Sequence, residues 1–328
     1  MRWLNKMLVV AVLVAFGFAY SAEPEVTIKF PLKVSLKHPR TLKTQEFAKW
    51  VEKYSNGKIK VEVYPGSQLY KTKEGLQALT MGGVEMMNPP NGHLVAYSKL
   101  FDLIELPFIF NTPQDFWNFL YSDIGWKIIK SAEKSNIVGL TAMDEGPMVI
   151  AAKDHFVKSP KDFKGMKIRT SGHPIVEDAI RTFGGSTVRL PLGEVYTAAQ
   201  QGVINGVYTT FSAYMKKHLY EVLPYVTLFP NHGAYVWVAS KQWWDKLPPY
   251  YKYIIETAAK SAAAEYDVEI WSNLDNYIQQ LKSHGGHYYR PTPKDLKAME
   301  KAFSPNWKKY KAKYGPIFDD VLKAAKGK

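Results

Sequence analysis

The chain alternates segments of strand periodicity with segments of helix periodicity from Val26 onward, and this alternation restricts the possible fold more than any other feature. Apolar and polar residues alternate over 26–30 and over 59–63, which is the period of a half-buried strand. Between them, the segment 47–54 carries apolar residues at the i, i+3, i+4, i+7 spacing of a helix face. A second helical segment then precedes a third predicted strand at 84–87. This succession predicts an α/β protein whose parallel or mixed sheet has helices on both faces.

The middle of the chain repeats the same plan. Strand and helix patterns alternate there over 166–170, 174–183, 187–190, 195–200 and 206–211. Two such units, with a change near residue 145 and a return near residue 232, predict two lobes. We expect lobe I to comprise 22–146 plus about 232–274, and lobe II to comprise 147–231 plus about 275–328 with the C-terminal helices.

The C-terminal third has a different pattern. No Gly or Pro interrupts the segment between Pro249 and His284, so a helix of about 35 residues there would be about 50 Å long. A helix of this length would brace both lobes. Two helices separated by a kink that the sequence does not mark fit the same pattern.

The N-terminal segment 1–21 predicts an export signal. Arg2 and Lys6 precede an apolar run at 7–18, and small residues before Ala22 suit cleavage at that point. The alternative is a membrane anchor, but a run of about a dozen residues is shorter than the roughly 20 that a spanning helix needs. We therefore expect a protein of the bacterial periplasm.

The charge of the chain favours anionic partners. The 328 residues include 43 Lys and Arg against 30 Asp and Glu, for a net charge of +13. The lysines are spread along the chain rather than concentrated with stacking aromatic residues, so nucleic-acid binding is not expected. The excess charge would attract anionic ligands or an anionic membrane surface. The absence of cysteine excludes disulfides, thiolate zinc sites and thiol nucleophiles.

No catalytic signature is present in the sequence. It contains no G-x-S-x-G, H-E-x-x-H, P-loop or G-x-G-x-x-G motif. The nearest approach to a metal-binding pair, His284 and His287, has no third ligand nearby and follows the predicted helix. We expect neither catalysis, nor a cofactor, nor a metal site.

Five segments carry a resemblance to a known family. They are NGKIKVEVYPGSQL at 56–69, LPFIF at 106–110, KGMKIR at 164–169, EVYTA at 194–198 and QGVING at 201–206. In this order they resemble the extracytoplasmic solute receptors of TRAP transporters, the DctP-type periplasmic solute-binding proteins, over essentially the whole mature chain. The resemblance implies two α/β lobes with mixed sheets, joined by cross-over hinge strands and braced by a long helix. It also implies closure on an organic acid and delivery to the membrane subunits of a TRAP transporter.

The resemblance assigns the central ligand contact to Arg169. In the family the arginine of this strand end pairs with the ligand carboxylate, and a guanidinium offers two parallel N–H donors that match a carboxylate. Many members carry a second arginine where this chain has Pro147. Thr209 aligns with a position that often contacts the ligand. One strong cation instead of two favours a monocarboxylate, because a second buried carboxylate without a partner would be costly.

Other candidates for the ligand site lie in loops that follow strands, where open α/β sheets bind ligands. They are His38, Glu74, Asn88 and Asn91. An apolar or stacking wall would come from Tyr196, Tyr208, Phe211 and Trp237. Core packing explains each of these aromatic residues equally well. If most of them face the ligand, the ligand has an apolar or aromatic body.

The expected function is therefore a periplasmic receptor that captures an organic acid, a monocarboxylate with an apolar body, and delivers it to a TRAP-type secondary transporter. Two other binding functions remain open from the sequence. The closed receptor could present its ligand to a sensor protein, or it could serve an ATP-driven importer. A hydrolase or lyase would need an acid–base pair or an activated nucleophile, and the sequence offers neither.

Overall fold

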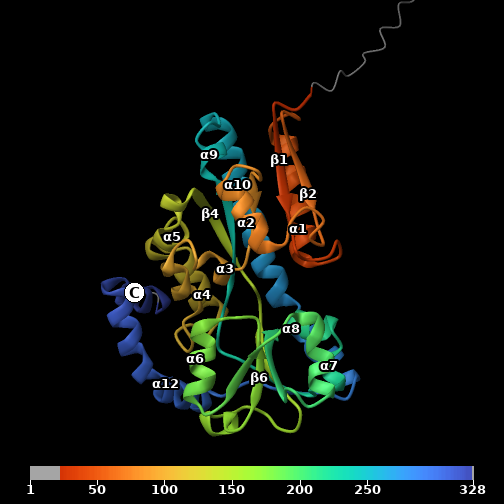
Figure 1. Cartoon of the computed structure of the whole chain (residues 1–328), viewed down its shortest axis with the longest axis vertical. Helices are drawn as coiled ribbons and strands as arrows, with labels where there is room; N and C mark the ends of the chain where they lie inside the picture. Colours follow the sequence, from red (N-terminus) through yellow and green to blue (C-terminus); the bar gives the residue numbers. More distant parts are fainter. Residues whose placement is uncertain (1–22, 327–328) are drawn as a thin grey trace, which may run out of the picture.

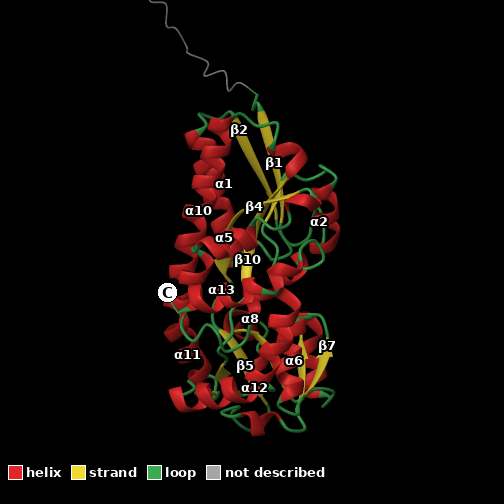
Figure 2. Cartoon of the chain, turned by 90° about the vertical axis from the view of Figure 1, so that its left-hand side faces the viewer, coloured by secondary structure: helices red, strands yellow, loops and turns green. Residues whose placement is uncertain are grey.

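The computed structural model describes residues 23–326, so the predicted export signal at 1–21 lies outside the described residues. Two lobes lie one above the other along the long axis of the molecule (Figures 1 and 2). We call lobe I the half that contains the sheets β1-β2 and β3-β10-β4, and lobe II the half that contains a six-stranded sheet. The expected α/β class and two-lobed architecture are confirmed.

Lobe I begins with the predicted strand–helix–strand unit. Strands β1 (Val26–Pro31) and β2 (Ile59–Tyr64) pair in parallel, and helix α1 (Pro39–Tyr54) connects them. The predicted third strand is shorter than expected and does not join this pair. Instead β3 (Met86–Met87) pairs with β10 (Ala234–Ser240), which also pairs antiparallel with β4 (Ile137–Asp144). Sequence-distant strands therefore build this sheet.

Lobe II is built on the sheet β11-β9-β5-β8-β6-β7. Strand β6 runs parallel to β7 and β8, whereas β5 runs antiparallel to β8 and β9, so the sheet is mixed. Its strands are β5 (Met148–Ala152), β6 (Lys167–Thr170), β7 (Ser186–Arg189), β8 (Gly206–Thr210), β9 (Tyr225–Leu228) and β11 (His287–Tyr289). Its helices α6 (Pro174–Thr182) and α7 (Val195–Gln200) follow strands as the sequence pattern predicts. Helix α8 (Phe211–Lys216) was not predicted and begins at Phe211, where the sequence pattern placed the end of a strand.

Two of the connections between the lobes join one strand directly to another, and we call these the crossings. The first runs from β4 to β5 through 145–147, and the second runs from β9 to β10 through 229–233. The backbone N–H of Glu145 donates to the carbonyl of Gly233 over 2.9 Å, so the crossings are hydrogen-bonded to each other. Gly146 has φ +93°, and a Cβ there would lie 2.5 Å from Ile270 Cγ1, so no other residue fits this position.

The predicted 35-residue helix is two helices. Helix α10 (Pro249–Ser272) packs on α1 and β4 in lobe I, and α11 (Leu274–Ser283) packs on α8 and β11 in lobe II. The break falls at Asn273, whose side-chain Nδ2 donates to the Glu269 carbonyl over 2.9 Å. Because an Asn side chain competes with the backbone for helix hydrogen bonds, it favours a helix end here. Together the two helices still span both lobes.

The C-terminal segment returns to lobe I, although we expected all of 275–328 to belong to lobe II. Helix α12 (Pro293–Tyr314) packs against α6, and then α13 (Pro316–Ala325) packs against α4 (Pro113–Leu120) and α5 (Asp123–Ile129) in lobe I. The turn between them is at Gly315, with φ +66°. An apolar surface on α13, with Phe318 and Val321 buried, draws it onto these helices.

The remaining elements are short. They are the helices α2 (Thr72–Thr80), α3 (Asn91–Leu94) and α9 (Lys241–Trp244), with the 3-10 helices η1 (Lys99–Glu105), η2 (Glu133–Ser135), η3 (Pro160–Phe163), η4 (Leu192–Glu194) and η5 (Leu219–Glu221). Helix η1 is the one that matters for the site, because it ends at Glu105 where the lobes meet. In the described part of the chain, no helix is both long and apolar enough to cross a membrane.

Candidate functional site

Arg169 is a buried cation in lobe II. It lies on β6, only 3% of its surface is exposed, and its Nε donates to the Leu190 carbonyl over 2.8 Å. No Asp or Glu among residues 23–326 forms an ion pair with it. Burial lowers the pKa of the guanidinium to about 10, because the folded protein disfavours its charged form. Arg169 therefore carries a positive charge that the described chain does not neutralise.

A second buried cation, Arg40, lies in lobe I and was missed by the sequence analysis. It occupies the first turn of α1, is 4% exposed, and stacks with its Cζ 4.0 Å from the ring centroid of Tyr235. Its Nη1 donates to the Asn88 carbonyl over 3.2 Å, whereas its buried Nε has no hydrogen-bond partner in the described structure. Arg40 follows the first strand-to-helix connection, which is a common place for ligand binding in α/β sheets. From this connection, the sequence analysis named only His38 as a candidate.

Arg40 and Arg169 both lower the pKa of a third basic residue, Lys33. Burial lowers the pKa of Lys33 first, and the charges of Arg40 and Arg169 lower it further. His38 caps α1 by accepting a hydrogen bond at Nδ1 from the backbone N–H of Arg40 over 3.1 Å. Burial, followed by the charges of Arg40 and Lys216, lowers the pKa of His38 to about 3. His38 is therefore neutral and adds no charge to this cationic region.

An ion pair joins the lobes beside this region. Nδ1 of His173, the residue before α6, lies 2.9 Å from both carboxylate oxygens of Glu105 at the end of η1. Burial alone would lower the pKa of His173, but the charge and hydrogen bond of Glu105, together with Glu145, raise it to about 9. The imidazole is therefore protonated at neutral pH, and its charge is already paired.

Glu145 places a carboxyl group in the first crossing. The residue is 7% exposed, and its buried Oε1 has no hydrogen-bond partner in the described structure. Burial raises the pKa of Glu145 to about 7. Asn88 Oδ1 and Asn231 Oδ1 are likewise buried without a donor. Since buried polar atoms in folded proteins almost always have partners, these atoms indicate a place for another molecule or for water.

Several predicted site residues lie at this junction. Register pairs Arg169 with Val207, so Arg169 and Thr209 lie on the same face of the sheet, and Thr209 is 8% exposed. Tyr208 lies on the opposite face, where its hydroxyl accepts from Asn231 Nδ2 over 2.7 Å. Asn88 contacts Arg40 through its carbonyl and donates from Nδ2 to Thr44 Oγ1 over 3.2 Å.

The structure gives the other predicted site residues different surroundings. Glu74 is exposed and accepts from the Lys71 backbone N–H over 3.4 Å as part of the cap of α2. Asn91 uses both ends of its amide on backbone, donating to the Phe101 carbonyl over 3.2 Å and accepting from Ala234 N–H over 2.9 Å.

The remaining predicted aromatic residues serve packing or pair with a neighbour. Phe211 and Trp237 are 0% exposed and lie in the apolar cores of lobe II and lobe I, respectively. The hydroxyl of Tyr196 donates to Glu221 over 2.6 Å at the surface. Pro147, where the family often has arginine, is buried, and its carbonyl accepts from Phe211 N–H over 2.8 Å. An apolar wall made of these aromatics is therefore absent from the junction.

A buried polar network supports both crossings from behind. Asp144 Oδ2 accepts from Trp271 Nε1 over 2.8 Å and lies 3.1 Å from His232 Nδ1. The Asp144 backbone N–H donates to Asp267 Oδ1 over 2.6 Å, and the Tyr121 hydroxyl donates to Asp267 Oδ2 over 3.0 Å. Burial, followed by the charge of Asp144, raises the pKa of Asp267 well above its usual range. This network connects the two crossings to α10.

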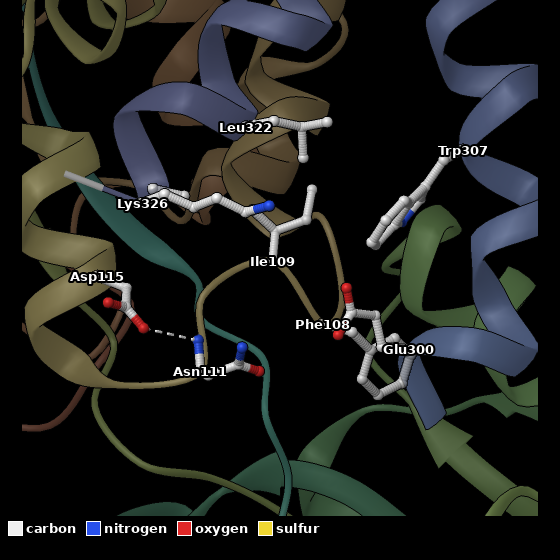
Figure 3. Close-up of a pocket in the computed structure, with 9 residues that line it drawn as sticks. Phe108, Ile109, Asn111, Asp115, Glu300, Trp307, Leu322 and Lys326 are labelled. Carbon is white, nitrogen blue, oxygen red and sulfur yellow. Dashed lines mark hydrogen bonds between the residues drawn. The ribbon is translucent and has the colours of Figure 1, made fainter. Parts of the chain in front are cut away.

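A separate cavity of about 330 Å³ lies where the C-terminal helices meet the loop 106–111 (Figure 3). It is lined by Phe108, Ile109, Asn111, Asp115, Glu300, Trp307, Leu322, Ala325 and Lys326. Its one hydrogen bond between lining residues in the figure runs from the Asn111 backbone N–H to Asp115 over 3.1 Å. None of these residues belongs to the junction of Arg40 and Arg169. In the described chain, no group of three His, Asp or Glu residues is placed to hold a metal ion.

Two α/β lobes with double crossings and unpaired cations between them define the class of two-lobed solute-binding receptors. The chain belongs to the DctP family, described as bacterial extracellular solute-binding protein, family 7, which matches residues 32–313. It is 30% identical over 291 residues to the C4-dicarboxylate-binding periplasmic protein DctP of Rhodobacter capsulatus, covering 87% of this chain and 86% of that one. The family resemblance found in the sequence is thereby confirmed.

Solved structures show the same architecture. A TRAP periplasmic solute-binding protein from Ochrobactrum anthropi has a TM-score of 0.88 at 27% identity and covers 93% of this chain and 96% of that one. Another from Sulfurospirillum deleyianum, solved with bound succinate, has a TM-score of 0.79 at 27% identity and covers 92% of this chain and 99% of that one. The chain is thus a receptor of the TRAP type by family and by fold.

Proposed function

We propose that this protein is a periplasmic receptor that binds an organic acid between its lobes and delivers it to a TRAP-type secondary transporter. The observation that carries the proposal is a pair of buried arginines, Arg40 in lobe I and Arg169 in lobe II, neither of which has an ion-pair partner among the described residues. A buried charge without a partner is costly. A ligand carboxylate between the lobes would supply the missing negative charge and accept the free guanidinium donors.

The position of the two arginines on different lobes supports closure as the binding mechanism. A ligand that contacts both guanidinium groups stabilises the arrangement in which the lobes are close together. The Glu105–His173 pair, which joins the lobes, acts in the same direction. Closure also removes water, which strengthens the charged contacts inside.

The ligand that we propose differs from the monocarboxylate with an apolar body that the sequence favoured. That prediction needed one cation and an aromatic wall. Arg40 supplies a second cation, and Phe211 and Trp237 lie in the cores. We therefore propose an organic acid with a second anionic or strongly polar group. The name of the Rhodobacter capsulatus relative and the succinate in the Sulfurospirillum deleyianum structure support this proposal.

Isothermal titration calorimetry with a panel of acids tests the proposal. We expect succinate or malate to bind more tightly than branched-chain or aromatic monocarboxylates of similar size. Mass spectrometry of the molecule that co-purifies with the native protein identifies the ligand directly. A co-purified aromatic or branched monocarboxylate would restore the sequence-based prediction, and the absence of binding by any acid in the panel would refute the receptor proposal.

Two further parts of the proposal concern location and partner. Residues 1–21 would direct export, so the N-terminal sequence of protein from the periplasmic fraction should begin at Ala22. The ligand-bound form should co-purify with membrane subunits that lack an ATPase. Ligand-dependent capture of a sensor protein instead would assign the receptor to signalling.

A further inference from the structure

The junction between the lobes contains more hydrogen-bond acceptors than the chain satisfies. Asn88 Oδ1, Glu145 Oε1 and Asn231 Oδ1 are all buried and have no donor in the described structure. Asn88 contacts Arg40 through its carbonyl, and Asn231 donates to Tyr208, whose ring packs 5.9 Å from that of His173. Asn88 therefore lies beside Arg40, and Asn231 lies beside Tyr208 and His173.

Glu145 is held firmly in this position. Its backbone N–H donates to the Gly233 carbonyl over 2.9 Å, and a Cβ on Gly233 would lie 3.2 Å from its Cδ and 3.4 Å from its Oε2. The carboxyl group thus packs against the second crossing, in the space that a side chain at residue 233 would fill. No described Lys, Arg or His forms an ion pair with it.

A carboxylate such as Glu145 is unexpected in a site that binds anions, and it therefore indicates which kind of anion the site binds. Arg40 and His173 attract its negative charge, whereas Glu105 and Asp144 oppose it. A carboxylate next to the ligand repels the ligand's own carboxylate, so a site built for unsubstituted acids gains nothing from it. An acceptor at this point is useful when the ligand brings a donor. A hydroxyl group is such a donor, and an unsubstituted dicarboxylate has none.

We propose that Glu145 makes the site selective for hydroxylated organic acids, by accepting a hydrogen bond from a ligand hydroxyl while Arg40 and Arg169 bind the carboxylate groups. Asn88 and Asn231 offer acceptors to further hydroxyls. This inference rests on the proposed receptor function and adds the class of acid. A polar site that hydrogen-bonds a substrate hydroxyl discriminates strongly against the analogue without it, because the buried acceptor is then left unpaired.

Matched pairs of acids that differ by one hydroxyl test the proposal by calorimetry. The pairs are succinate with malate, propionate with lactate, and glutarate with 2-hydroxyglutarate. We expect the wild type to bind the hydroxylated member of the best-binding pair at least about tenfold more tightly, which is the smaller end of the effect of a hydrogen bond to a charged group. Equal binding of both members in every pair overturns the inference and leaves the receptor proposal intact, whereas failure of all six acids overturns both.

Substitutions at Glu145 identify the residue responsible. Glu145→Met removes the acceptor, so the preference should fall to within about twofold while the affinity for the acid without the hydroxyl is kept or improved. Glu145→Gln keeps an acceptor oxygen and should retain part of the preference. Glu256→Met, at a partly exposed position on α10, is the matched control and should behave as the wild type. An unchanged preference in Glu145→Met refutes the role of this residue.

The wild type alone provides an independent readout if the methionine variant does not fold. The ratio of the two affinities within a pair cancels effects on the shared carboxylates. Above about pH 6.5 the carboxyl groups of both acids in a pair are ionised, so Glu145 dominates the pH dependence of the ratio. Because an ionised carboxylate accepts a hydrogen bond more strongly than a protonated one, the ratio should rise between about pH 6.5 and 8.5 as Glu145, with its pKa of about 7, ionises. A ratio that is constant or falls with pH contradicts the proposal, and Glu145→Gln should make the ratio independent of pH.

Discussion

Replacing Arg169 with methionine should weaken ligand binding and stabilise the ligand-free protein, two effects of opposite sign. The substitution keeps an unbranched apolar side chain as far as the position of Arg Nε and removes the guanidinium. Two parallel charge-assisted hydrogen bonds to a carboxylate are lost, at about 3–5 kcal/mol for the pair, which corresponds to a dissociation constant roughly 150- to 5,000-fold larger. The expected loss of binding is therefore easily measured with succinate or malate.

The stability effect follows from the burial of the same side chain. Burial lowers the pKa of Arg169 from 12.5 to about 10, and at about 1.4 kcal/mol per pKa unit the charged form costs the folded state about 3 kcal/mol. A lowered pKa disfavours a cation at every pH below it, so this cost is present at neutral pH. The substitution also removes the hydrogen bond to the Leu190 carbonyl, worth about 1 kcal/mol. The expected net gain is about 2 kcal/mol.

Urea denaturation of the ligand-free protein and calorimetry with the best-binding acid measure the two effects separately. The control is Arg181→Met, in the same lobe, where the arginine is exposed and pairs with Asp178 on the surface of α6. This control should change neither property appreciably, because exposed ion pairs contribute little. A methionine variant of Arg169 that loses stability and keeps its affinity would show that the side chain serves the fold and not the ligand.

Three further predictions test the neighbouring groups. Arg40→Met should weaken the binding of succinate at least about tenfold more than the binding of propionate, because only the diacid has a second carboxylate that loses its charged partner. If calorimetry shows the same loss of affinity for both acids, Arg40 does not belong to the site. The pKa of His173 is raised to about 9, so its charged form stabilises the fold fully below pH 6.5, and this contribution is lost as the pH rises through about 9. In His173→Gln, the free energy of unfolding measured with urea should therefore depend less on pH over that range. Burial raises the pKa of Asp267, so its charged form destabilises the fold at neutral pH; Asp267→Asn should therefore raise the free energy of unfolding at pH 7, and a less stable variant would contradict this reasoning.

Sequence motifs located one half of the cationic pair. Arg169 ends a segment that resembles a family motif, and so its role could be inferred before its surroundings were known. Arg40 belongs to no such motif. It stands two residues after His38 in the first turn of α1, and its surroundings come from Tyr235 and Asn88, which lie in distant parts of the chain.

The aromatic residues show a different limit of sequence reasoning. All seven residues of β10 are buried, so its two faces cannot be distinguished by polarity, and Trp237 could have faced either the ligand or the core. The ring packs 5.3 Å from Phe30 and 4.9 Å from Phe47, between centroids, and this contact decides for the core. The two packing partners, Phe30 and Phe47, lie 207 and 190 positions before Trp237 in the chain.

The sequence by itself determined the order of strands and helices, the two-lobed α/β class and the family, because periodicity and motifs are properties of neighbouring residues. The tertiary structure alone decided which charges are paired. Arg189 is neutralised by Glu177 over 2.7 Å and His173 by Glu105 over 2.9 Å, whereas Arg40 and Arg169 find no carboxylate among the described residues. Charge pairing depends on distances between groups far apart in the chain, so no local pattern encodes it, and the site that we propose is built on two of the charges that folding leaves unpaired.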